Sequence, residues 1–347
     1  MRDEAALEAA LEILAPFGPD LSNGMTSHAP MAVEALCTLG RGDTALPWIE
    51  RYRPLLLPRP RPRGRIDTRE WRASLGREER AAEWSALFGE ELANAPWQDV
   101  LARWTGRLAP GLCAAATHGV LRVAHAARSL AHAETALRRD ELAAALGYWA
   151  ATYQTLPTGA GAGTASSARA ALGRVERVPI ERRRFDGTIT GALAALDDHP
   201  SFAAVIDRFD AERPADTAIA DLTEAFARAF LANAHDPLSA IVFVHGITSS
   251  AALRSLVPFL DPVTAREALR YAWQAGAALY ATFGTAPPVP GDIEPPAADR
   301  DTWIDRAVAH GDEHAIKGVE ACLAEHARHP SPAYLAAACR LLDVLPR

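Results

Sequence analysis

The chain has 347 residues, is 49% hydrophobic and 23% charged, and carries a formal net charge of −7. This composition is typical of a globular protein with a sizeable core, and the acidic excess argues against a general nucleic-acid binder. We recognise no signal peptide and no apolar run of the roughly 18 residues that a membrane span needs, so we expect a cytoplasmic protein that does not enter a membrane.

Apolar residues recur at helical spacing along most of the sequence. Residues 3–15 begin the pattern, and a helix capped by Thr26 or Ser27 is expected to run to Leu39, with Gly40 closing it. Further helices are predicted at about 79–93, 111–134, 138–155, 217–234, 250–260, 263–283, 301–310, 313–328 and 332–344.

Two segments could be extended, and neither changes the predicted fold class. Residues 240–244 (AIVFV) fit a strand or a buried helix equally well, and residues 175–190 could also be extended. Since no pair of alternating segments is joined by a hairpin turn, we predict a mainly all-α protein. Residues 1–347 are expected to form one large, bundle-like helical domain.

Three segments interrupt the helices. Residues 54–65 are rich in proline and arginine and are expected to form an extended surface arm. Residues 157–168 form a Gly/Ala-rich loop of the kind that often closes over an active site, and residues 286–298 form a stiff, proline-rich connection.

Lysine is almost absent from the sequence. Of 36 basic residues only Lys317 is a lysine. In such a chain a solvated cation would nearly always be arginine, so the lone lysine raises the question of what its amine can do that a guanidinium cannot. An amine can lose its proton and react, whereas arginine stays protonated. A leftover surface lysine is the alternative interpretation.

The histidines are the other candidates for chemistry. His28 lies near the start of a helix among small apolar residues, and His245 ends the run AIVFV beside Gly246. His118, Arg122 and His125 have the spacing of one helix face. His310, His314 and Lys317 share the same spacing in a later helix.

Buried imidazoles from separate helices can converge on a metal ion, although a histidine on an apolar helix face is more often an ordinary core residue. No HExxH, Cys/His or HxD signature strengthens the metal interpretation. Four other histidines are adjacent to turn-forming residues and are expected at the surface: His199, His235, His326 and His329.

An ordered set of fragments resembles the questin oxidase-like family. The fragments are SNGMTSHAPMAVEAL, THGVLRVAHAARSL, LGYWAATYQTLP, HGITSSAALRSLVPFL and DEHAIKGVEACL, which together span about residues 20–325. The resemblance implies a non-haem iron held by four histidines and a lysine carboxylated on its amine. Carried over by motif, these ligands are His28, His118, His245, His314 and Lys317.

The charges of the implied ligands fit a buried ferrous ion. Four neutral imidazoles leave its +2 charge uncompensated in a low-dielectric core, and a carbamate on Lys317 would lower the net charge to +1. His314 and Lys317 are one helical turn apart, so both can reach the same ion.

The resemblance further implies an oxidoreductase, an O₂-dependent mono- or dioxygenase that cleaves a ring of an aromatic or quinone-type small molecule or inserts oxygen into it. Arg122, His125 and Tyr153 are candidates to orient or deprotonate such a substrate. Tyr148, Trp149 and Gln154 would complete an aromatic wall with a polar anchor. Glu34 and Glu313 could fix imidazole tautomers.

Two alternatives stay open at this point. One is an NADPH-dependent Baeyer–Villiger-type monooxygenase, although the GAGAG at residues 159–163 lacks the strand–turn–helix context of a dinucleotide site. The other is a non-enzymatic helical scaffold or binding protein. Either interpretation, like the oxygenase, is compatible with a homo-oligomer.

Overall fold

The structure is a computed structural model that describes residues 3–159, 165–294 and 296–346. It is mainly all-α, as predicted. The longer helices are α1 (Glu4–Leu14), α2 (Ala29–Thr38), α3 (Ala45–Tyr52), α4 (Ala81–Asn94), α5 (Trp97–Leu108), α6 (His118–His132), α7 (Ala136–Ala151), α10 (Ala215–Asn233), α11 (Pro237–Ala252), α12 (Pro262–Phe283), α13 (Arg300–His310), α14 (Glu313–Arg328) and α15 (Pro332–Val344). Two short helices, α8 (Ala168–Leu172) and α9 (Ile189–Ala192), and several 3₁₀ turns lie in the connections.

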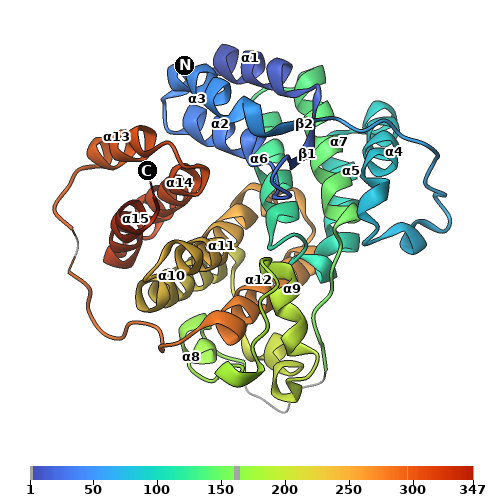
Figure 1. The fold of residues 1–347 in the computed structure, drawn as a ribbon. Helices are drawn as coiled ribbons and strands as arrows, with labels where there is room; N and C mark the ends of the chain where they lie inside the picture. The colour runs from blue at the N-terminus through green and yellow to red at the C-terminus, as the bar shows by residue number, and fades with distance from the viewer. Residues whose placement is uncertain (1–2, 160–164, 295, 347) are drawn as a thin grey trace.

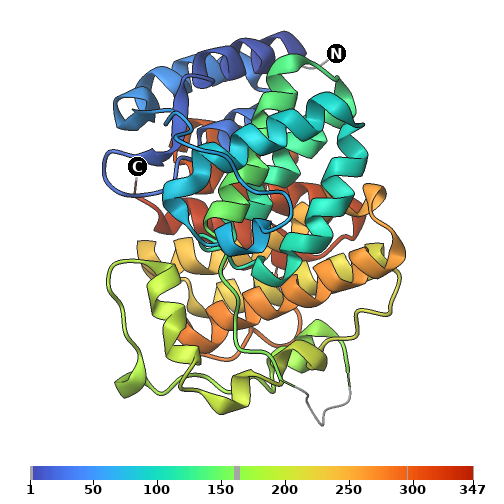
Figure 2. The ribbon, with the colours of Figure 1, turned by 90° about the vertical axis from the view of Figure 1, so that its right-hand side faces the viewer.

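The helices form two groups according to the hydrophobic clusters that they share, and Figure 1 shows α1–α3 next to one another at the top of the view. The N-terminal helices α1–α3 share a small hydrophobic cluster, and most of the remaining helices share a much larger one. In Figure 2, the short elements between α7 and α10 line one end of the molecule, below the long helix α12. The prediction of a single domain over residues 1–347 stays a prediction.

A short antiparallel pair of strands was not predicted from the sequence. β1 (Phe17–Leu21) pairs with β2 (Leu56–Pro58), with Phe17 opposite Pro58 and Leu21 opposite Leu56. The strands are joined through α2 and α3 and not by a hairpin turn, so no local turn signal marks them. The proline- and arginine-rich arm therefore begins as an edge strand, and it is largely exposed beyond that strand.

Several helix boundaries differ from the sequence predictions. Residues 240–244 lie inside α11, so the ambiguous run is helical. The helix predicted from residue 111 starts only at His118, and the helix predicted for residues 250–260 ends at Ala252 and continues as 3₁₀ turns. Neither α3 nor α5 was predicted. Residues 175–190 contain a 3₁₀ turn and the start of α9.

One helical segment corrects the expectation that the sequence contains no apolar run long enough for a membrane span. Pro237–Phe259 is long and apolar enough to cross a membrane, judged by its length and composition alone. Its most apolar window is 67% buried inside the protein, as in the core helix of a globular fold.

Glycines beside three of the candidate ligands let neighbouring helices approach closely. A Cβ on Gly318 would lie 2.4 Å from Leu341 Cδ2 and 2.9 Å from Val244 Cγ2. Similar overlaps would arise between Gly119 and Trp149, and a tighter-than-usual contact between Gly246 and Phe226. These glycines therefore fix the spacing of α6, α11 and α14.

A substitution at Gly318 tests this packing, and Gly89 of α4 provides a matched control. Gly318→Ala is expected to lower the free energy of unfolding by roughly 1–3 kcal/mol, because the added methyl overpacks the contacts of α14 with α11 and α15. Gly89→Ala, where nothing lies within 4 Å of the added Cβ, is expected to raise it by about 0.5–1 kcal/mol. Urea unfolding of both variants measures the difference. Equal stability of the two variants would contradict the packing argument.

Candidate metal centre

Four helices surround the candidate metal centre. α2 packs against α6, α6 against α11, α11 against α14 and α14 against α2, which closes a ring of contacts. Each helix contributes at least one of the five side chains predicted as ligands: His28, His118, His245, His314 and Lys317. The ring of contacts brings residues almost 290 positions apart into one buried place.

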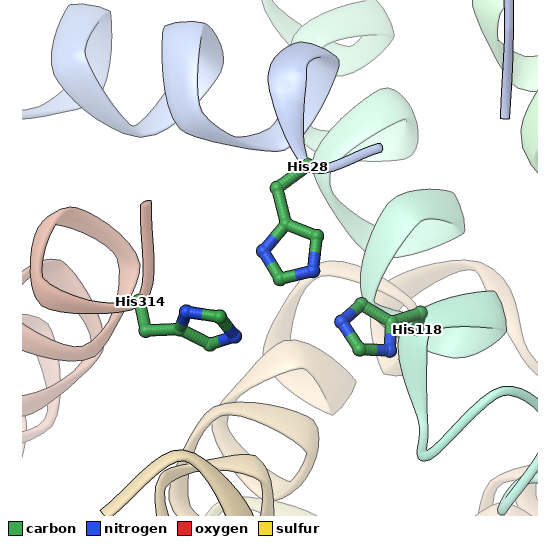
Figure 3. Close-up of side chains that lie close together, drawn as sticks. All are labelled: His28, His118 and His314. Carbon is green, nitrogen blue, oxygen red and sulfur yellow. The ribbon is translucent and has the colours of Figure 1, made fainter. Parts of the chain in front are cut away.

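The imidazole rings point toward one another. The ring centroid of His28 lies 4.4 Å from that of His118 and 4.5 Å from that of His314, and Figure 3 shows the three side chains converging from three elements. Their ligand atoms all lie within 4.8 Å of one another, a spacing that suits a metal ion. The His245 ring centroid lies 4.7 Å from that of His118 and 5.5 Å from that of His314.

Two nitrogen lone pairs face each other at the centre of this cluster. His245 Nδ1 lies 2.6 Å from the carbonyl oxygen of Ile241, and His118 Nδ1 makes a short contact with that of Ala115. A carbonyl oxygen can only accept, so each Nδ1 carries the proton and each neutral ring leaves Nε2 bare. The two Nε2 atoms are 3.2 Å apart. They cannot hydrogen-bond to each other, and a cation between them would satisfy both.

Burial keeps these two rings neutral. It lowers the pKa of His118 to about 3, with further lowering by Lys317. The pKa of His245 is also lowered well below its usual value, first by burial and then by His118. A proton shared between the rings is therefore disfavoured at neutral pH, which leaves a metal ion as the better-fitting cation.

Lys317 is buried and contacts His28. Its Nζ lies 3.1 Å from His28 Nδ1, and the lysine is only 3% exposed. Burial lowers the pKa of the amine to about 8, while Glu313 and Asp312 oppose the shift. Such an amine is deprotonated far more readily than a solvated one, as a reaction with carbon dioxide requires.

The N-terminus of α14 orients His314. Asp312 caps this helix by accepting hydrogen bonds from the backbone of His314 and Ala315, at 2.8 and 3.1 Å. His314 Nδ1 lies 3.4 Å from the same Asp312 oxygen without hydrogen-bond geometry, and this buried nitrogen has no hydrogen-bond partner among the described residues. Glu313 Oε1 lies 3.8 Å from His28 Nδ1, near the position expected for a group that fixes the tautomer.

Strained backbone precedes His118. Ala115, Ala116 and Thr117 have φ values of 47°, 54° and 73°, in the left-handed region that non-glycine residues avoid. This turn delays the start of α6 to His118 and places the Ala115 carbonyl against His118 Nδ1. Periodicity in the sequence gives no sign of it.

Arg122 and His125 do not join His118 at the cluster. Arg122 binds Glu141 of α7 through two hydrogen bonds of 2.6 and 2.8 Å. His125 Nδ1 lies 2.7 Å from Glu34 Oε2, so Glu34 partners His125 and not one of the clustered imidazoles. The spacing of His118, Arg122 and His125 along α6 could not show that the three side chains have different partners.

The side chains that were expected to form one aromatic wall lie in different environments. α7 ends at Ala151, so Tyr153 and Gln154 lie beyond the helix. Tyr148 Oη lies 2.6 Å from Thr26 Oγ1, and Trp149 is fully buried with its indole nitrogen bonded to Gly111 O. Tyr153 is partly buried, with its ring packed against Gly111.

The structure also places the other histidines. His310 ends α13, and Gly311 with a positive φ separates it from α14, so His310 does not share a helix face with His314. His199 is buried and close to the carbonyl of Glu176, which corrects its expected surface position. His235 is exposed, and His326 and His329 are partly exposed.

Part of the predicted lid lies outside the described residues. Residues 160–164 of the 157–168 loop, and with them most of the GAGAG segment, are not described. Residue 295 of the proline-rich connection is likewise outside the described part.

The comparison with known protein families finds a match over most of the chain. Residues 43–322 match the model of a protein family described as Questin oxidase-like. This range contains His118, His245, His314 and Lys317, whereas His28 precedes it. No curated protein and no solved structure gives a significant match.

Glu34 gives a prediction for the pH dependence of stability. Burial would raise its pKa, but Arg128 and His125 together hold the pKa well below the usual value. The ionised form therefore contributes stability above pH about 4.5, and this contribution is lost as the pH falls toward the lowered folded pKa.

We expect Glu34→Gln to destabilise the protein at pH 7, and the difference from the wild type to shrink by up to about 1.4 kcal/mol per pH unit below pH about 4.5. Urea unfolding at about pH 7, 5, 4 and 3.5 measures the trend, because these values lie on both sides of the usual glutamate pKa of roughly 4.5. Glu79→Gln, at an exposed carboxylate, is the control. A constant difference across the series would count against the ion pair.

Proposed function

The chain belongs to the questin oxidase-like family, and from this premise we propose that it is a non-haem iron oxygenase of aromatic or quinone-type small molecules. The family description indicates an oxidoreductase. The iron, the use of dioxygen and the substrate class belong to the proposal. The observation that carries it is the pair of bare Nε2 atoms of His118 and His245, 3.2 Å apart and flanked by His28, His314 and Lys317.

The five side chains fit a ferrous ion by charge and by donor type. Imidazole nitrogens suit iron, and four of them give a neutral donor set. Lys317 would add the anionic donor: its neutral amine attacks carbon dioxide, a C–N bond forms and the nitrogen loses a proton to give a carbamate. The chain has no carboxylate in this ligand set, so the carbamate would supply the charge that lowers the burial cost of the ion.

A bound ferrous ion would supply the one-electron reactivity toward dioxygen that side chains lack. The protein's own part is to hold and orient. The carbonyls of Ala115 and Ile241 fix the Nδ1–H tautomers of two ligands, and the cap at Asp312 fixes the start of the helix that carries His314 and Lys317.

An NADPH-dependent monooxygenase is a weaker alternative, because the described residues offer no strand–turn–helix for a dinucleotide. A metal-free scaffold would leave the two facing lone pairs unsatisfied in the core, at about 1–3 kcal/mol for each. The iron content of the purified protein separates the scaffold from the enzyme.

Iron content also tests the individual ligands. We expect about one iron per chain in the wild type after anaerobic loading, and a large loss in His245→Ala and His118→Ala, because each removes a first-row-metal donor. His125→Ala and the exposed His235→Ala are expected to keep the iron. Elemental analysis gives the result. Retained iron in His245→Ala would remove that residue from the set, and loss in His125→Ala but not in His118→Ala would move the ligand by two helical turns.

Lys317→Arg tests the carbamate. The variant keeps a cation on α14 but cannot react with carbon dioxide, so we expect a folded protein without dioxygen consumption in the presence of a hydroquinone. Wild-type protein in isotope-labelled bicarbonate is expected to show a carbamate carbon resonance that is missing from the variant. Circular dichroism checks the fold. Full dioxygen consumption by Lys317→Arg would refute the ligand role.

A further inference from the structure

A cavity of about 410 Å³ lies between α6, α11 and α14, next to the candidate metal centre. Its walls include Leu121, Ala251, Pro258 and Phe259 together with several alanines. Of the five candidate ligands only Lys317 is among its lining residues, and Thr248, one turn beyond His245 on α11, also lines it. The volume is within the range of small-molecule sites, roughly 300–1,000 Å³.

Two arginines at this cavity are paired with carboxylates. Arg128 donates to Glu34 at 2.9 Å and to Glu320 at 2.8 Å, and Arg254 donates to Glu325 at 2.6 and 2.8 Å. Both arginines are partly buried, and these carboxylates neutralise them. Arg328 also lines the cavity but is exposed, so water screens its charge. An anionic ligand would therefore gain no buried, unpaired arginine, and an uncharged ligand fits better.

His125 lines the cavity and can offer it a hydrogen-bond acceptor. Glu34 is ionised, because its pKa is lowered, and a carboxylate can only accept. Its 2.7 Å contact with His125 Nδ1 therefore requires the proton on Nδ1, and in the neutral ring this leaves Nε2 as an acceptor. Arg128 lies 3.3 Å from the same Nδ1, too far to compete with the shorter contact. Every hydrogen bond that the described residues make with the His125 ring involves Nδ1.

We propose that this cavity binds an uncharged hydroxylated aromatic molecule, whose hydroxyl group donates to His125 Nε2 while its ring packs against Leu121, Ala251 and Phe259. The inference deepens the proposed function, since it places the substrate beside Lys317, but binding itself does not need the iron. Arg122 and Tyr148 line a different cavity of about 240 Å³ between α4, α7 and β1, which is the competing location.

Binding of 2-naphthol, followed by its own fluorescence, tests the assignment. We expect saturable binding to the wild type, a loss of affinity of at least about tenfold in Ala251→Phe, which fills the cavity, and no change in Ala82→Phe, which fills the competing one. Both positions are half-buried, and circular dichroism confirms that each variant folds. Unchanged binding in Ala251→Phe, or loss only in Ala82→Phe, overturns the proposal.

The hydrogen bond is tested by comparing 2-naphthol with 2-methoxynaphthalene, which cannot donate. The wild type is expected to prefer the naphthol by roughly fivefold, about the contribution of one neutral hydrogen bond, and His125→Phe is expected to abolish that preference. A preference that survives in a folded His125→Phe variant overturns the role of His125.

Iron analysis of the same samples separates this proposal from the proposed function. Naphthol binding that depends on Ala251 in a protein unable to hold iron supports the cavity and refutes the oxygenase. Iron retention without naphthol binding supports the oxygenase and refutes the cavity as the binding site.

Discussion

The structure around the candidate metal centre depends on two imidazole nitrogens that face each other with no proton between them. His118 and His245 each use their only N–H on a backbone carbonyl, and their Nε2 atoms lie 3.2 Å apart. A protein core tolerates such an arrangement poorly, since each unsatisfied acceptor costs about 1–3 kcal/mol. A cation at this point would be bound by both acceptors, so the same geometry would form a binding site. The need to hold the two Nε2 atoms in this position explains much of the surrounding structure.

The strain before α6 is one consequence of that constraint. Three successive residues in the left-handed region cost roughly 1–2 kcal/mol each, yet Ala115–Thr117 adopt it and so bring the Ala115 carbonyl to His118. Close helix packing is another. Gly119, Gly246 and Gly318 adjoin His118, His245 and Lys317 in sequence, and each removes a methyl group that would push a neighbouring helix away. The turn before α6 thus costs stability, whereas the three glycines allow the close packing of the helices that carry the ligands.

Sequence reasoning identified the helical class and the residues that cluster, but not the geometry that relates them. The questin oxidase-like resemblance nominated the set of four histidines, and the rarity of lysine singled out Lys317 independently; the structure places all five side chains together. Spacing failed where the backbone departs from a regular helix. His310 was expected beside His314, but the positive φ of Gly311 divides that segment into two helices. The β1–β2 pair depends on a contact between residues about 35 positions apart, which no local pattern encodes.

A second network ties together helices that surround the metal centre. Glu34 of α2, His125 and Arg128 of α6, and Glu320 of α14 form a buried chain of charge-assisted hydrogen bonds. Three of the four helices that carry candidate ligands are thus tied together a second time, by side chains that do not face the cluster. Removing one member of a buried ion pair leaves its partner uncompensated, so this network fixes helix positions strongly. The same carboxylate that anchors α2 to α6 also sets the tautomer of His125, and the position of the helices and the chemistry of the cavity therefore have a common physical cause.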